Sequence, residues 1–203
     1  MNRLDSGLVV FEGPHGSGKT TQAMMLKRHL DERRIPAVIT GEPYMPKLKD
    51  VIGQCSQGRV ELCPYVLLYL HAADRFAHVR YIKEELRKGT VVISDRYLLS
   101  SYVYQQIQGL DVSLIEEANS FCMEPTVTFI LDTPWKERKQ RLDQAGRMRN
   151  TLFFTDESLS ADGILYQDAF RRYREKWRNV LMIDGSRSAD STQREIASLF
   201  ETI

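Results

Sequence analysis

Eight consecutive residues near the amino terminus combine glycine, lysine and threonine in a spacing suited to phosphate binding. The string Gly13-Pro14-His15-Gly16-Ser17-Gly18-Lys19-Thr20 matches GxxxxGK[ST] without a mismatch, and it lies between an apolar run and a helical pattern. Its glycines let backbone amides wrap around phosphates at the amino end of a helix. Lys19 is expected to reach the β and γ phosphates, and the Thr20 hydroxyl to bind Mg²⁺. The expected residues of this nucleoside triphosphate site are Gly13, His15, Gly16, Ser17, Gly18, Lys19, Thr20 and Thr21.

A second group of polar residues follows an apolar run or lies on a helical pattern further along the chain. Asp95 and Arg96 end the run that begins at residue 91, where the carboxylate can hold Mg²⁺ and the guanidinium can bind a phosphate. Arg75 belongs to a long helical pattern, in the string Ala73-Asp74-Arg75. A structural ion pair or a solvated helix charge is the alternative interpretation of these charges. Ser100, Ser101, Tyr104 and Gln105 open the next helical pattern with hydrogen-bonding groups and an aromatic ring.

Basic residues are concentrated after Pro134 in a stretch interrupted by glycine. They are Lys136, Arg138, Lys139, Arg141, Arg147 and Arg149. A run of charges commonly forms a solvated face, but the place of this run resembles that of the mobile lid that small NTP-dependent kinases close over phosphates. We therefore expect a basic lid at about residues 141–160.

Short apolar runs alternate with helical patterns along the whole chain. Strands are predicted at 8–11, 37–40, 91–95, 127–132 and 180–184, and helices at 20–33, 61–88, 100–122, 134–145, 162–178 and 192–200. Gly89 is expected to end the second helix. Continuous apolar strands that alternate with helices indicate a mostly parallel five-stranded sheet with helices on both faces, a three-layer α/β fold. The motifs above lie at carboxyl ends of strands, where such folds bind ligands.

Length and composition restrict the classes of protein that the chain can belong to. Its 203 residues predict one domain, 1–203, and 42% hydrophobic with 27% charged residues is typical of a soluble globular protein. The formal charge of +1 argues against a nucleic acid polymer as partner, and no apolar run is long enough to span a membrane. Cys55, Cys63 and Cys122 form no CxxC pair, which favours free thiols in the cytoplasm.

Taken together, these motifs resemble the thymidylate kinase family of P-loop kinases. The matching strings are Phe11-Glu12-Gly13 with the glycine-rich loop, Glu42-Pro43, Ala73-Asp74-Arg75, and Asp95-Arg96-Tyr97 with Ser100-Ser101 and Tyr104-Gln105. The likeness covers nearly the whole chain, from about residue 8 to 184. It implies transfer of the ATP γ-phosphate to dTMP, which gives dTDP, with Mg²⁺ at Thr20 and Asp95. It also implies a P-loop NTPase fold and a homodimer.

The resemblance also implies roles for individual residues. Arg96 would bind the acceptor phosphate, Arg75 a pyrimidine carbonyl, and Tyr104 the deoxyribose. The other expected substrate residues are Glu42, Pro43, His71, Ser100, Ser101 and Gln105. The loop has no basic residue before Lys19, so lid arginines are expected to act in catalysis with Lys19, Asp95 and Arg96; the candidates are Arg141, Arg147 and Arg149.

Three departures from the family pattern affect the acceptor site. Gly41 stands where an arginine is common, His15 replaces a common acidic residue, and His71 takes the place of a stacking aromatic ring. Lys47 or Lys49 could substitute for the arginine. The alternatives are therefore the same reaction on another nucleoside monophosphate, such as dUMP or a modified pyrimidine, or a deoxynucleoside kinase with Glu42 as base. A nucleotide-binding protein without catalysis is a third.

Overall fold

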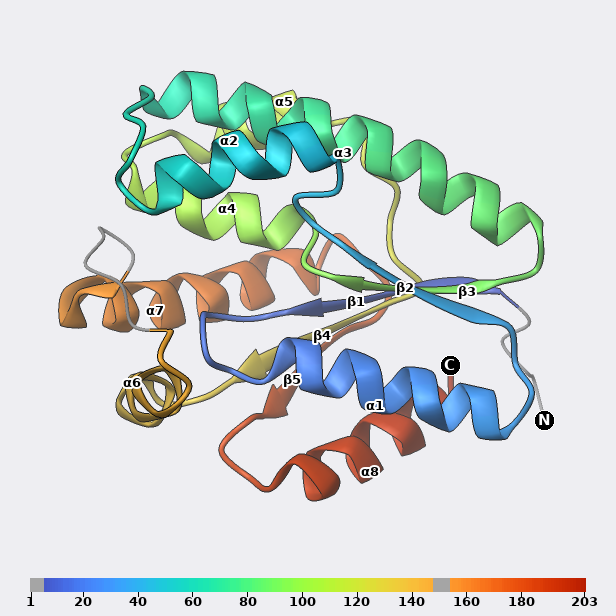
Figure 1. The fold of residues 1–203 in the computed structure, drawn as a ribbon. Helices are drawn as coiled ribbons and strands as arrows, with labels where there is room; N and C mark the ends of the chain where they lie inside the picture. Colours follow the sequence, from blue (N-terminus) through green and yellow to red (C-terminus); the bar gives the residue numbers. More distant parts are fainter. Residues whose placement is uncertain (1–5, 148–153) are drawn as a thin grey trace.

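The computed structural model describes residues 6–147 and 154–203, and its centre is a parallel sheet (Figure 1). The strands are β1 (Gly7–Glu12), β2 (Ala37–Gly41), β3 (Val91–Asp95), β4 (Val127–Asp132) and β5 (Val180–Asp184), in the order β2-β3-β1-β4-β5. Every pairing in this sheet is parallel. The prediction of a five-stranded α/β sheet is confirmed, and the predicted bounds of β3, β4 and β5 match the structure.

Alternation along β1 divides the core between the two faces of the sheet. Leu8 and Val10 belong to the cluster that contains Val79, Tyr102 and Tyr166 on helices of one layer. Val9 and Phe11 belong to the cluster with Leu26 and Phe200 on the other layer. These four side chains of β1 are fully buried, as expected of a central strand covered on both faces.

Helices cover both faces of the sheet (Figure 1). On one side lie α1 (Lys19–Glu32) and α8 (Ala189–Phe200), which pack against each other. On the other side α3 (Pro64–Arg87), α4 (Leu98–Ile107) and α7 (Asp156–Tyr173) contact the strands or one another. The remaining helices are α2 (Pro46–Ser56), which packs on α3, α5 (Val112–Ala118), which packs on α3 and α4, and α6 (Trp135–Gln144), which packs on α7.

Several predicted helix bounds are wrong. The pattern at 100–122 is two helices, separated at Gly109, which has a φ of +86° that few other residues adopt. Helix α7 begins at Asp156, before the predicted start at residue 162, because Thr155 caps it by accepting a hydrogen bond from the Ser158 amide. Helix α2 was not predicted. By contrast, Gly89 follows the end of α3 with a φ of +75°, as predicted.

The polarity of the strands determines where ligands can bind. Because the five strands run in the same direction, the segments that follow them gather at one edge of the sheet. The predicted lid includes the end of α6 and the start of α7, and its central residues 148–153 lie outside the described residues. Within the described ranges, no helix is both long enough and apolar enough to cross a membrane.

Candidate active site

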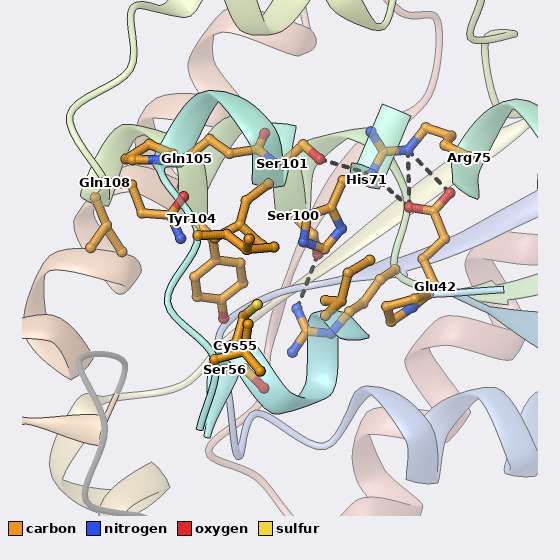
Figure 2. A pocket seen from close by; sticks show the side chains of 18 of the residues that line it. Glu42, Cys55, Ser56, His71, Arg75, Ser100, Ser101, Tyr104, Gln105 and Gln108 are labelled. Carbon is orange, nitrogen blue, oxygen red and sulfur yellow. Dashed lines mark hydrogen bonds and ion pairs between the residues drawn. The ribbon is translucent and has the colours of Figure 1, made fainter. Parts of the chain in front are cut away.

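Two cavities open at the carboxyl edge of the sheet. The first, of about 840 Å³, is lined by residues 15–22 and by segments that follow β3 and β5; we call it the P-loop cavity. The second, of about 680 Å³, lies between α2, α3 and α4 (Figure 2); we call it the Arg75 cavity. His15, Ser56 and Arg96 line both cavities, so the two spaces meet at these side chains.

The glycine-rich loop is packed tightly against β4 and α6. Gly13 has a φ of +135°, and a Cβ there would lie 2.6 Å from the Leu131 carbonyl oxygen. At Gly16 a Cβ would lie 2.9 Å from the Arg138 carbonyl oxygen. Gly13 therefore supports the loop without lining the cavity. The other predicted residues of this site, His15, Gly16, Ser17, Gly18, Lys19, Thr20 and Thr21, all line the P-loop cavity.

Lys19 bends back over the loop, where its Nζ donates a hydrogen bond to the Pro14 carbonyl oxygen at 2.7 Å. Burial and the Arg96 guanidinium lower the pKa of this amine to about 7, against the opposite effect of Asp95 and Glu12. An anionic phosphate beside Nζ would favour the charged amine, because opposite charges stabilise each other. A bound polyphosphate would therefore stabilise the protonated form of Lys19.

Thr20 and Asp95 place two oxygen ligands side by side. The Thr20 hydroxyl donates a hydrogen bond to Asp95 Oδ2. Asp95 Oδ1 is buried, and no hydrogen-bond partner for it exists among the described residues. Carboxylate and hydroxyl oxygens are ligands that suit Mg²⁺, so these two residues fit the predicted metal position.

Arg96 lies where the two cavities meet. Its φ of +79° is unusual for a residue other than glycine, and its amide donates to the Phe11 carbonyl oxygen at 2.9 Å. Its Nη1 donates to Ser100 Oγ at 3.0 Å, and its Nη2 is 3.3 Å from His15 Nδ1. Although burial alone would lower the pKa of this guanidinium, Tyr104 and nearby carboxylates keep it above the ordinary value. Arg96 thus presents a permanent positive charge to both cavities.

Arg75 and Glu42 form a buried ion pair at the base of the Arg75 cavity (Figure 2). Arg75 Nε donates to both Glu42 oxygens at 3.1 and 2.9 Å, and Arg75 Nη2 donates to Glu42 Oε2 at 2.6 Å. The same Nη2 contacts Ser101 Oγ at 2.9 Å. Burial alone would raise the pKa of Glu42, but Arg75 and His78 together lower it. A carboxylate bound in this way is a weak base, which disfavours the role of Glu42 in a deoxynucleoside kinase.

The far end of the Arg75 cavity, away from the Arg75–Glu42 ion pair, is lined by polar and aromatic groups. Figure 2 shows Tyr104, Gln105 and Gln108 on one side of the space. Gln105 Oε1 is buried, with no hydrogen-bond partner in the described part of the chain. Burial lowers the pKa of His71 to about 4, so its ring is neutral near pH 7. The predicted substrate residues Glu42, Pro43, His71, Arg75, Arg96, Ser100, Ser101, Tyr104 and Gln105 all line this cavity.

The basic segment is divided between surface and interior. Arg141 and Arg147 line the P-loop cavity, whereas the catalytic candidate Arg149 lies outside the described residues. Arg138 is not a lid charge, because it is only 1% exposed and forms an ion pair with Asp162. Neither Lys47 nor Lys49 is among the residues that line the two cavities, so the expected substitution for an arginine at Gly41 finds no support.

Several residues of the site were not predicted. Ser56 and Gln108 line the Arg75 cavity, Arg187 lines the P-loop cavity, and the Asn119 side chain accepts a hydrogen bond from Arg75. Only Gln108 had a readable signal, since it follows Gln105 at helical spacing. Ser56 ends α2, Asn119 follows α5 and Arg187 follows β5, so the positions of these three residues depend on tertiary packing.

Comparison with known proteins agrees with this geometry. The family model described as thymidylate kinase matches residues 11–196. A probable thymidylate kinase of Methanocaldococcus jannaschii is 30% identical over 200 residues, which cover 98% of each chain. A probable thymidylate kinase of Thermococcus kodakarensis is also 30% identical, and a thymidylate kinase of Desulfotalea psychrophila is 29% identical over 97% of this chain and 95% of that protein. The chain therefore belongs to the thymidylate kinase family, whose members are kinases that use ATP as phosphate donor.

Proposed function

We propose that this chain transfers the γ-phosphate of ATP to dTMP and releases ADP and dTDP. The observation that carries this proposal is the meeting of the two cavities at Arg96, His15 and Ser56. ATP would lie in the P-loop cavity and the monophosphate in the Arg75 cavity. The bond between the γ-phosphorus and its bridging oxygen would break there, and a new bond would form to an oxygen of the acceptor phosphate.

The acceptor needs no general base. A monophosphate has a second pKa of about 6, so its phosphate is largely dianionic at neutral pH and can attack directly. The main obstacle is repulsion between two polyanions, which positive groups must offset. Lys19, Arg96, Arg141 and Arg147 line the P-loop cavity, which supports this role for them. The same role is proposed for Arg149.

Mg²⁺ would be held by Thr20 and Asp95. When bound there, the ion would neutralise charge on the phosphate oxygens of the donor. The hydrogen bond between Thr20 and Asp95 holds these oxygen atoms together, and both residues line the P-loop cavity with Lys19.

Recognition of the nucleoside is assigned to the far end of the Arg75 cavity. We propose that the neutral His71 ring stacks on the base, and that Arg75, Ser101 and Gln105 bind its polar edge. The buried Oε1 of Gln105 supports this assignment, because an unsatisfied buried acceptor gains most from a ligand donor. Tyr104 would contact the sugar and exclude a 2′-hydroxyl.

The first experiment measures ADP release by the purified protein with MgATP and a series of acceptors. Turnover with dTMP, and much weaker turnover with UMP or thymidine, is expected. Rapid turnover with dUMP or another nucleotide instead would keep the reaction but assign the base site to a different ligand. Lys19→Ala and Arg96→Ala should each lower turnover by about two orders of magnitude or more while the protein stays folded. Near-normal kinetics of either variant would refute its role.

We also propose that the protein is a cytoplasmic homodimer. Support comes from an apolar stripe on one face of α3, where Tyr65, Tyr69 and Phe76 are 57%, 56% and 55% exposed. The free thiols of Cys55, Cys63 and Cys122 are compatible with a reducing compartment. Sedimentation equilibrium at micromolar concentration tests the dimer, and Tyr69→Glu should shift the population toward the monomer.

A further inference from the structure

Glu12 is a buried carboxylate that does not line either cavity. It is the last residue of β1, directly before the glycine-rich loop, and it is fully buried. Its Oε1 accepts hydrogen bonds from the amides of Tyr97 at 2.8 Å and Ser100 at 3.0 Å. Its Oε2 accepts from Ser100 Oγ at 2.7 Å and from the Tyr166 hydroxyl at 3.2 Å. A side chain with four donors around it is fixed in one orientation.

Two of these bonds fix the start of helix α4. The first amides of a helix have no partner within the helix, and the residue before α4, Tyr97, provides no side-chain cap. Glu12 accepts from two of these amides, and its negative charge suits the amino end of the helix dipole. The end of β1 is thereby joined to α4, the helix that carries Ser100, Ser101, Tyr104 and Gln105.

The other bonds determine the direction in which the Ser100 hydroxyl points. A hydroxyl has one hydrogen, and that of Ser100 is donated to Glu12 Oε2. The Ser100 oxygen is then an acceptor for Arg96 Nη1 at 3.0 Å. Each group in the chain from Arg96 through Ser100 to Glu12 therefore donates to the next. Burial raises the pKa of Glu12, whereas the hydrogen bond from Ser100 and the charge of Arg96 favour its ionised form. In that form Glu12 sets this direction, because a carboxylate can only accept.

Arg96 is attached to the end of β1 a second time, through its own backbone. Its amide donates to the carbonyl oxygen of Phe11, the neighbour of Glu12. The guanidinium that faces both cavities is thus held from the strand that leads into the glycine-rich loop.

We propose that Glu12 is a positioning residue for phosphoryl transfer, which acts through Ser100 to hold the Arg96 guanidinium against the acceptor phosphate. This inference rests on the proposed function, since it concerns the acceptor side of that reaction. It predicts a defect in the use of the acceptor and little change in the use of ATP.

Glu12→Gln tests the proposal with almost no change in volume. The amide oxygen can still accept from the Tyr97 and Ser100 amides, so the helix start is preserved. The amide NH₂ now donates to Ser100 Oγ and competes with Arg96 Nη1 for that oxygen, and the Ser100 hydrogen, which loses its carboxylate acceptor, turns toward Arg96 or toward the Tyr166 hydroxyl at 3.1 Å. We expect kcat/KM for dTMP to fall by about 10- to 100-fold, and KM for ATP to stay within about twofold of the wild-type value.

Asp168→Asn is the matched control. Asp168 accepts a hydrogen bond from the Tyr102 hydroxyl at 2.6 Å, so it joins the same helices, α4 and α7, without contact to Arg96. Its kinetics should be close to wild type. Wild-type activity on dTMP is measured first, because its absence would overturn the proposed function and this inference together. An active wild type with a normal Glu12→Gln variant would overturn this inference alone.

A double-mutant cycle with Ser100→Ala distinguishes positioning from general stabilisation. If Glu12 acts through Ser100, adding Glu12→Gln to Ser100→Ala should change kcat/KM for dTMP by less than about threefold. If kcat/KM for dTMP in the double variant falls by the product of the two single-variant factors, the proposal is wrong. Should Glu12→Gln fail to fold, Ser100→Ala is decisive by itself, and a normal kcat/KM for dTMP in that variant would refute the chain of contacts.

Discussion

Replacement of Arg138 by leucine should destabilise the protein strongly, because its guanidinium joins three separate segments inside the molecule. Arg138 Nη2 donates to Asp162 Oδ1 at 2.9 Å, and both side chains are 1% exposed. Arg138 Nε donates to the Thr133 carbonyl oxygen at 2.9 Å, and Arg138 Nη1 to the His15 carbonyl oxygen at 3.2 Å. A third carbonyl oxygen, that of Leu159, accepts from Nη2.

The magnitude follows from this burial. Removal of one partner of a buried pair leaves an uncompensated charge and costs about 3–5 kcal/mol. Burial raises the pKa of Asp162 to about 6 even beside Arg138, so the pocket strongly disfavours a carboxylate. A loss of this size is a large part of a typical stability of about 5–15 kcal/mol. Arg138→Leu combined with Asp162→Leu should recover part of it, because no charge then remains buried.

The assay is urea denaturation followed by the fluorescence of Trp135 and Trp177, the two tryptophans of the chain. Lys139→Ala is the matched control, because Lys139 is the next residue on α6 and its ion pair with Asp156 is 44% and 51% exposed. That pair should contribute about 0–1 kcal/mol. If Arg138→Leu lowers the free energy of unfolding no more than Lys139→Ala does, the account of the buried pair is wrong.

Three further predictions concern residues around the two cavities. Burial lowers the pKa of His71 to about 4, so the unfolded chain binds more protons than the folded one between about pH 4 and 6.5. The free energy of unfolding should therefore rise with pH in this range. His71→Phe should reduce this dependence of the free energy of unfolding on pH in denaturation curves, and an unchanged dependence would contradict the lowered pKa of His71. Gly41→Ala should lower the free energy of unfolding, because its Cβ would lie 2.8 Å from the Asp95 carbonyl oxygen; a thermal unfolding temperature equal to wild type would show that β2 can shift freely. Thr20→Ala should raise the Mg²⁺ concentration needed for half-maximal turnover, and an unchanged Mg²⁺ titration would exclude that hydroxyl as a ligand.

Much of the fold could be predicted from the sequence because the strands are continuous apolar runs. The bounds of β3, β4 and β5 are correct for this reason, and the parallel sheet follows from their alternation with helices. Helix α2 was missed because it is short, buries only one side chain, Ile52, and contains Gly53, which lowers helix propensity. The early start of α7 was missed because its first turn is polar, although Thr155 followed by Asp156 and Glu157 is a readable capping signal.

In the candidate site, too, some residues could be predicted from the sequence and others could not. The glycine-rich loop and Asp95 could be placed because both follow predicted strands, and parallel strands bring their carboxyl ends to one edge. Membership of the thymidylate kinase family, expected from these motifs, is confirmed. The burial of Arg138 and the contact of Ser56 with both cavities could not be predicted, since each depends on how helices far apart in the sequence pack.

The order of strands in the sheet has a consequence for how the chain folds. β1 is completed within the first 12 residues, but its neighbours β3 and β4 come only after residues 90 and 126. Long loops must therefore close before the central strand gains either partner, which makes parallel sheets slow to form. During synthesis the apolar run from Leu8 to Phe11 stays without its neighbours until β3 and β4 have been made. We expect this segment to be the part of the nascent protein most exposed to aggregation.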